Sequence, residues 1–178
     1  MGKLHLGTAL LLTALCLVAA VRAPAQEQEQ SAPAIRTEPP ATTSGGSGMA
    51  LLNLDNTVAL HGYDPVAYFT QNRARRGSKA IKERLGGATY YFASRANRYA
   101  FLKDAPSYQP QVGGFCVTSM SMGRLEDVDP EKFLVFEGKL YLFRDDSAMT
   151  VFLNNPRRVI AEATNHYFLL AQRQRGYY

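Results

Sequence analysis

A break in composition near residue 50 divides the chain into a part that can form a hydrophobic core and a part that cannot. Residues 26–48 alternate Gln with Glu and then run through prolines, Thr, Ser and Gly. So few apolar side chains cannot offset the entropy lost on ordering, and we expect a disordered linker over residues 26–50. The folded domain is then expected over residues 51–170, with a C-terminal tail at 171–178. About 120 residues suffice for one core.

The first 25 residues have the pattern of a cleavable signal peptide. Lys3 and His5 form a short basic region, and an apolar segment follows over residues 9–21. This segment is short for a membrane span. Residues 23–25 read Ala-Pro-Ala, an A-x-A signal that predicts cleavage after Ala25. We therefore expect a periplasmic or secreted protein.

Export changes the cysteine count, because Cys16 leaves with the signal peptide and only Cys116 remains. Lipidation of Cys16 is the less favoured alternative, since the bulky Leu15 precedes it. One cysteine cannot form an intramolecular disulfide, so the core must stabilise the domain. Cys116 is then a buried apolar residue, half of an intermolecular disulfide, or a ligand or reactive thiol. Burial is the default, because free Cys is among the most buried residue types.

The net charge of +5 comes from one segment, residues 73–84. The segment contains Arg73, Arg75, Arg76, Lys79, Lys82 and Arg84 against Glu83. A nucleic-acid partner is not expected, because the protein is exported and the segment has no interleaved aromatic residues for stacking. We expect a solvated loop or sheet edge, with contact to an anionic membrane surface as the next alternative.

Turn and cap signals predict a compact α+β fold of short antiparallel strands with helices packed on them. Strands are expected at 57–60 and 88–93, and a hairpin over 133–143. Helices are expected to start at Asp64-Pro65 and Ser94, at one of residues 145–147, and at Asn155-Pro156, the last two forming a C-terminal helix pair. Residues 110–123 are expected to be an ordered loop. The sequence shows neither an internal repeat nor coiled-coil heptads.

Several motifs, taken in order, resemble the YHS domain family in the variant found on exported bacterial proteins. They lie at residues 62–69, 90–94, 97–98, 101, 106, 108, 110–116, 128–130 and 138–142. The wider family, with its TRASH-type relatives, implies metal binding through cysteines in a Asp-Pro-Val-Cys opening and at a helix start. Here those positions hold Ala67 and residues 92–97, none of which is Cys. The usual metal site is therefore absent.

Cys116 follows Gly113-Gly114, as the exported variant of the family implies. Met120 and Met122 add soft thioethers, and with His166 or His61 they form a candidate copper site. The alternative interpretation is that both Met residues fill the core and that both His residues are ordinary packed or surface groups.

The resemblance also implies Tyr63, Asp64 and Tyr91 as neighbours of Cys116 in a ligand site. Aromatic residues between 63 and 101 either line a pocket for a small ligand or haem, or form the core; they are Tyr63, Tyr68, Phe69, Tyr90, Tyr91, Phe92, Tyr99 and Phe101. No recognisable catalytic motif is present. The favoured hypothesis is a non-enzymatic binding or accessory module for a small ligand or protein partner. The alternatives are a copper or haem carrier and a Cys116-dependent enzyme or redox protein.

Overall fold

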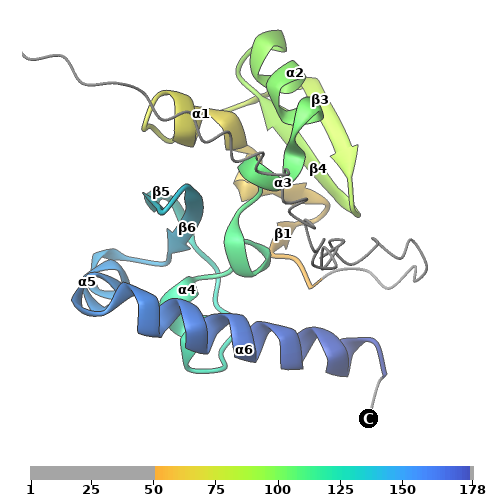
Figure 1. The fold of residues 1–178 in the computed structure, drawn as a ribbon. Helices are drawn as coiled ribbons and strands as arrows, with labels where there is room; N and C mark the ends of the chain where they lie inside the picture. The colour runs from red at the N-terminus through yellow and green to blue at the C-terminus, as the bar shows by residue number, and fades with distance from the viewer. Residues whose placement is uncertain (1–50, 177–178) are drawn as a thin grey trace, which may run out of the picture. The chain divides into compact units, whose positions relative to one another are not determined.

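The computed structural model describes residues 51–176, which form the predicted α+β fold (Figure 1). A mixed sheet has the strand order β1-β2-β4-β3, in which β2 and β4 run parallel and the other neighbours antiparallel. Its strands are β1 (Leu54–Asp55), β2 (Val58–Ala59), β3 (Ser78–Leu85) and β4 (Ala88–Phe92). The predicted hairpin is confirmed as β5 (Asp129–Phe136) and β6 (Lys139–Phe143). The signal peptide, its cleavage site, Cys16 and the linker lie outside the described residues.

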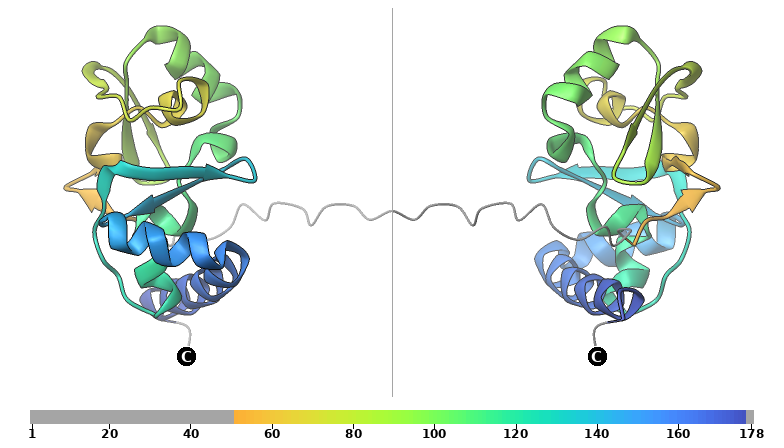
Figure 2. Two further views of the ribbon diagram at one scale, coloured as in Figure 1. Left: turned by 90° about the vertical axis from the view of Figure 1, so that its left-hand side faces the viewer. Right: turned by 90° about the vertical axis from the view of Figure 1, so that its right-hand side faces the viewer.

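Four helices start at the predicted cap residues: α1 (Pro65–Thr70), α2 (Arg95–Lys103), α5 (Asp146–Asn154) and α6 (Pro156–Gln174). The short helices α3 (Ala105–Tyr108) and α4 (Val117–Ser121) were not predicted, and the chain also forms the 3-10 turns η1 (Leu60–Gly62) and η2 (Gln111–Gly114). Asp64, Ser94 and Asp145 each accept a backbone N–H at the start of their helix. The long helix α6 packs against α4 (Figures 1 and 2). Among the described residues, no helix combines the length and apolar character needed to cross a bilayer.

Three parts of the predicted element pattern differ from the structure. The basic segment was expected to be a loop or a sheet edge, and its second half forms the edge strand β3, so the sheet-edge interpretation is confirmed and the loop interpretation is wrong there. Its side chains are almost all exposed, so no alternation of apolar residues marked it as a strand. Residues 110–123 contain η2 and α4 rather than one loop. Helix α6 continues through Gln174, past the expected tail boundary, and buries Ala171.

The core is rich in aromatic side chains. Tyr90, Phe92 and Phe101 cluster between β4 and α2, while Phe152 of α5 contacts three aromatic rings of the β5-β6 hairpin. Tyr68 of α1 packs edge-on against Phe133 of β5, with ring centroids 4.7 Å apart. Tyr68, Phe92 and Phe101 are fully buried, so the core interpretation holds for these three aromatic candidates.

The two hairpins, β3-β4 and β5-β6, have the same strand register at a constant spacing of 51 positions (78 to 129, 92 to 143). Ser78 pairs with Phe92 as Asp129 pairs with Phe143. Each hairpin then shifts register, and pairing resumes at Lys82 and at Phe133 respectively. A helix of 9 residues follows each hairpin, α2 capped by Ser94 and α5 capped by Asp145.

The turns that precede the two hairpins are also alike. Residues 60–62 have φ values of 55°, 50° and 82°, and residues 112–114 have 45°, 67° and 84°. The backbone N–H of Asp64 donates to the Arg75 carbonyl at 2.8 Å, as that of Cys116 donates to the Glu126 carbonyl at 3.1 Å. The domain therefore contains a structural repeat, with a first half from β2 through α2 and a second half from η2 through α5.

The expectation of no internal repeat is thus wrong for the structure. At the spacing of 51 positions the halves also share residue types: Gly87 matches Gly138, Tyr90 matches Tyr141, Phe92 matches Phe143 and Phe101 matches Phe152. Other equivalent positions differ, such as Asp64 and Cys116 or Lys82 and Phe133, so the similarity becomes clear only when the strand register aligns the halves.

Candidate functional site

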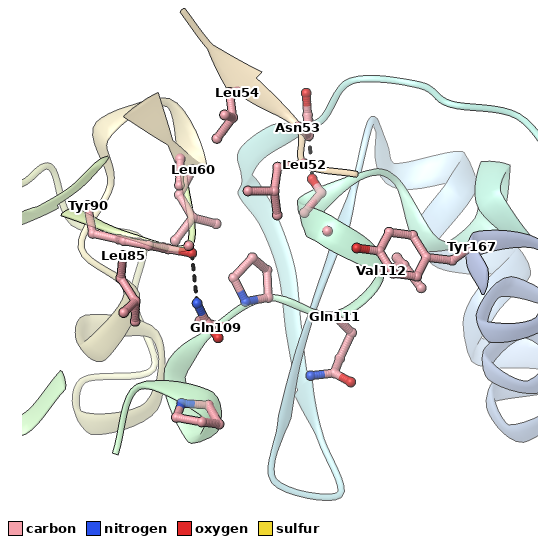
Figure 3. A pocket seen from close by; sticks show the side chains of 16 residues that line it. Leu52, Asn53, Leu54, Leu60, Leu85, Tyr90, Gln109, Gln111, Val112 and Tyr167 are labelled. Atoms are coloured by element: carbon pink, nitrogen blue, oxygen red, sulfur yellow. Dashed lines mark hydrogen bonds between the residues drawn. The ribbon is translucent and has the colours of Figure 1, made fainter. Parts of the chain in front are cut away.

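A cavity of about 420 Å³ lies between the two halves of the repeat (Figure 3). It is lined by Leu52, Asn53, Leu54, Ala59, Leu60, Leu85, Gly86, Tyr90, Pro106, Gln109, Pro110, Gln111, Val112, Gly113, Gly114 and Tyr167. Figure 3 shows Leu60, Leu85 and Tyr90 on one side and Val112 and Tyr167 on the other. None of these lining residues is charged at neutral pH, so the wall offers apolar surface with a few amide and phenol groups.

The polar groups of the wall are held in place. The Tyr90 hydroxyl accepts a hydrogen bond from Gln109 Nε2 at 3.1 Å, and the Tyr167 hydroxyl donates to the Leu51 carbonyl at 2.9 Å. Burial raises the pKa of both phenols above the ordinary value, so both stay neutral at physiological pH. They can therefore orient a ligand by hydrogen bonding, and neither is prepared to act as a base.

The two left-handed turns of the repeat frame this cavity. Leu60 and Val112 line it with φ values of 55° and 45°, although non-glycine residues rarely adopt positive φ and β-branched ones hardly ever do. Such backbone conformations persist only where the surroundings impose them, and they cluster at binding sites. At η2 the surroundings include the segment 51–53, because the Asn53 N–H donates to the Gly113 carbonyl at 2.9 Å.

Asp127 joins this segment to both turns. One of its oxygens, Oδ1, accepts hydrogen bonds from Asn53 Nδ2 and the Val128 N–H and contacts His61 Nε2, each at 2.8 Å. Burial acts to raise the pKa of Asp127, but the hydrogen bonds from Asn53, Val128 and His61 outweigh it and hold the pKa below its ordinary value. The carboxylate form therefore stabilises the junction of the two halves.

The predicted metal ligands are distributed around α4. Cys116 and Met120 are fully buried, and the Met120 N–H donates to the Cys116 carbonyl at 2.8 Å within the helix. Met122 is 54% exposed and its sulfur accepts from Arg124. His166 lies on α6, with its ring beside Gly123. His61 belongs to the Asp127 cluster instead. Within residues 51–176, no group of three or more His, Cys, Asp and Glu side chains could hold a metal ion.

The predicted ligand-site residues have separate surroundings. Asp64 is fully buried, and its carboxylate accepts from the Val66 and Ala93 N–H groups and from Asn97 Nδ2. The Tyr63 hydroxyl donates to Glu131 at 3.1 Å, and burial raises its pKa. Tyr91 lines a different, basic cavity at the start of β3.

Sequence reasoning missed most of the cavity between the halves. Of the aromatic candidates, only Tyr90 lines it. Two features of the sequence point toward this cavity. They are the Gly113-Gly114 pair shortly before Cys116 and the residues around His61-Gly62. The lining apolar residues come from five separate stretches of chain, so no local pattern groups them.

No family model, curated protein or solved structure matches the chain.

Proposed function

We propose that the protein is an exported, non-enzymatic binding module of YHS-like type, whose ligand is a small, neutral and largely apolar molecule held between the two halves. The motif order described above supports the YHS-like assignment, and the signal-peptide pattern supports export. The observation that carries the ligand class is the uncharged, mostly apolar wall of the 420 Å³ cavity. Small-molecule sites in proteins have this size range and this kind of lining.

The polar groups of the cavity favour binding over catalysis. General acid–base chemistry relies on His, carboxylate, Lys, Cys or Tyr side chains with a pKa near the working pH. Only Tyr90 and Tyr167 belong to these types among the lining residues, and burial moves their pKa values away from neutrality. Gln109, Gln111 and Asn53 add amide groups that suit a ligand with one or two polar atoms.

The test uses N-phenyl-1-naphthylamine, an uncharged aromatic dye whose fluorescence rises in apolar surroundings. The wild-type protein should bind it saturably. Leu85 lines the cavity and is 40% exposed, so Leu85→Glu places a charge at the wall without opening the core. This variant should weaken dye binding about tenfold. The bound dye would displace water from the introduced carboxylate, and no polar partner would replace that water.

Leu102→Glu is the matched control. Leu102 is 48% exposed on α2 and does not line the cavity. It should leave dye binding unchanged. Equal losses in both variants, or no saturable binding by the wild type, would count against the proposed ligand class.

A copper carrier is the second candidate, and one observation favours it. The Nδ1 atom of His166 is buried and has no hydrogen-bond partner within the described part of the chain. Buried polar atoms are normally paired, so an unpaired imidazole nitrogen on α6, the helix that packs against α4, suits a soft metal ion.

The metal content of the protein recovered from its native compartment separates the candidates. Stoichiometric copper that is lost in His166→Gln and in Cys116→Ser would establish the carrier. Metal-free protein that still binds the dye would leave the small-molecule module as the function.

A further inference from the structure

A second cavity, of about 530 Å³, lies between the β1-β2 turn and the start of β3. Its wall includes Arg76, Lys79 and Tyr91, together with the turn residues His61 and Gly62. It thus differs in chemistry from the uncharged cavity between the halves.

The Arg76 guanidinium is fixed at the wall of this cavity. Its Nη1 donates to the His61 carbonyl at 2.9 Å, and its central carbon lies 4.4 Å from the centre of the Tyr63 ring. These contacts use one face and one N–H of a group that has five N–H donors in a planar fork. The remaining donors are available to an anion, and the rotamer is already ordered.

Within residues 51–176, neither Arg76 nor Lys79 has a carboxylate partner. Arg76 and Lys79 take part in none of the ion pairs formed by the described residues. One carboxylate, Asp55, also lines the cavity and accepts a hydrogen bond from Asn56 Nδ2 at 3.1 Å. Excluding His61, which is committed to Asp127, the wall therefore keeps one more positive than negative charge.

The second half of the repeat shows that the fold does not need these cations. The position equivalent to Arg76 holds Asp127, because Arg75 and Glu126 supply equivalent carbonyls to Asp64 and Cys116. The position equivalent to Lys79 holds Pro130, one residue after the equivalent strand starts Ser78 and Asp129. The same turn and the same hairpin register form there without either cation. The fold therefore does not explain why Arg76 and Lys79 lie together at this cavity.

We propose that this cavity binds a phosphate-type oxyanion between Arg76 and Lys79. Up to about two negative charges on a phosphate group match the two cations and outweigh Asp55. A guanidinium fork binds two phosphate oxygens in parallel, and a Lys ammonium adds a point charge. A soluble phosphate ester and a phospholipid headgroup both carry this chemistry, and the experiment distinguishes the two sources.

The experiment is a titration of the ¹⁵N-labelled mature protein at low salt, followed by backbone amide shifts. Inorganic phosphate should shift the amides of Gly62, Gly77 and Lys79 saturably. Lys79 is exposed, so Lys79→Gln should keep the fold and weaken phosphate binding about tenfold, the usual effect of losing one charge-assisted hydrogen bond. Lys82→Gln removes the same charge from the same strand outside this cavity, and should leave binding unchanged.

Vesicles of phosphatidylglycerol and of phosphatidylcholine distinguish the sources. A lipid headgroup is the ligand if the protein sediments with phosphatidylglycerol alone and Lys79→Gln reduces this more than Lys82→Gln. A soluble ester is the ligand if phosphate binds and vesicles do not. Equal losses in the two variants would reveal diffuse attraction to the basic strand and overturn the site, as would the absence of shifts with either probe.

Discussion

Asp64 and Cys116 occupy equivalent positions in the two halves of the domain. Each follows a left-handed turn and an aromatic residue, each is the N-cap of a short helix, and each donates its N–H to the loop before the hairpin. Both side chains are fully buried, yet Asp64 accepts three hydrogen bonds whereas the Cys116 thiol caps no backbone N–H. The same backbone site is thus stabilised by polar contacts in one half and by packing in the other.

Asp64→Ala should lower the free energy of unfolding by about 3 kcal/mol or more, because it leaves the Val66 and Ala93 N–H groups and the Asn97 amide without their acceptor. Urea denaturation measures this. Ser94→Ala, which removes a single cap bond to Asn97, should cost about 1 kcal/mol. Comparable losses in the two variants would mean that the Asp64 network contributes no more than one cap.

Cys116→Ser should destabilise the domain more than Cys116→Ala, because the serine hydroxyl enters an apolar site and the alanine only leaves a small cavity. We expect about 1–3 kcal/mol for Ser. The buried thiol of the wild type should react with iodoacetamide only after denaturant unfolds the chain. Rapid alkylation of the native protein would contradict the packing role and favour a reactive cysteine.

Gly113→Ala should cost about 3 kcal/mol, since its φ of 67° disfavours a side chain and a Cβ would overlap the Leu51 carbonyl oxygen. Gly138→Ala is the control, because Gly138 has a φ of 71° and nothing within 4 Å of a Cβ. It should cost about 1–2 kcal/mol. The difference between the two urea midpoints isolates the close approach of the segment 51–53, and equal costs would show that this approach does not matter.

Acid should weaken the junction of the two halves. The pKa of Asp127 is below its ordinary value in the folded state, so the carboxylate stabilises the domain above the unfolded pKa near 3.8 and this contribution is lost as the pH falls through the lower folded pKa. Asp127→Asn should therefore flatten the dependence of the urea midpoint on pH below about pH 4. Asn53→Ala removes one of the hydrogen bonds that lower the pKa, and should weaken the same dependence. An unchanged profile in Asp127→Asn would exclude this group as a source of the acid sensitivity.

Local signals in the sequence predicted much of the fold. Asp64, Ser94 and Asn155 each begin a helix, because a cap residue acts on the backbone within three positions of itself. The hairpin turn at Gly138 was equally local. By contrast, β3 was missed because an exposed edge strand buries too little apolar surface to produce alternation, and α4 because its five residues follow a turn with two glycines.

The candidate site could not be predicted in the same way. Tyr90 and Val112 face one cavity only because the chain brings β4 and η2 together, and neither residue carries a signal of that contact. Cys116 attracted attention as a lone cysteine, but its side chain is buried in the core. The Gly113-Gly114 pair beside it marked the turn that does line the cavity.

Methyl NMR of the leucine and valine side chains, recorded while the neutral naphthylamine dye is added, tests the proposed ligand site most directly. A ligand bound between the two halves should cause saturable shifts at the lining residues Leu52, Leu60, Leu85 and Val112, with the exposed Leu102 and Leu153 unchanged. Shifts spread evenly over the exposed methyl groups, or none at the cavity residues, would contradict a small-molecule site between the two halves.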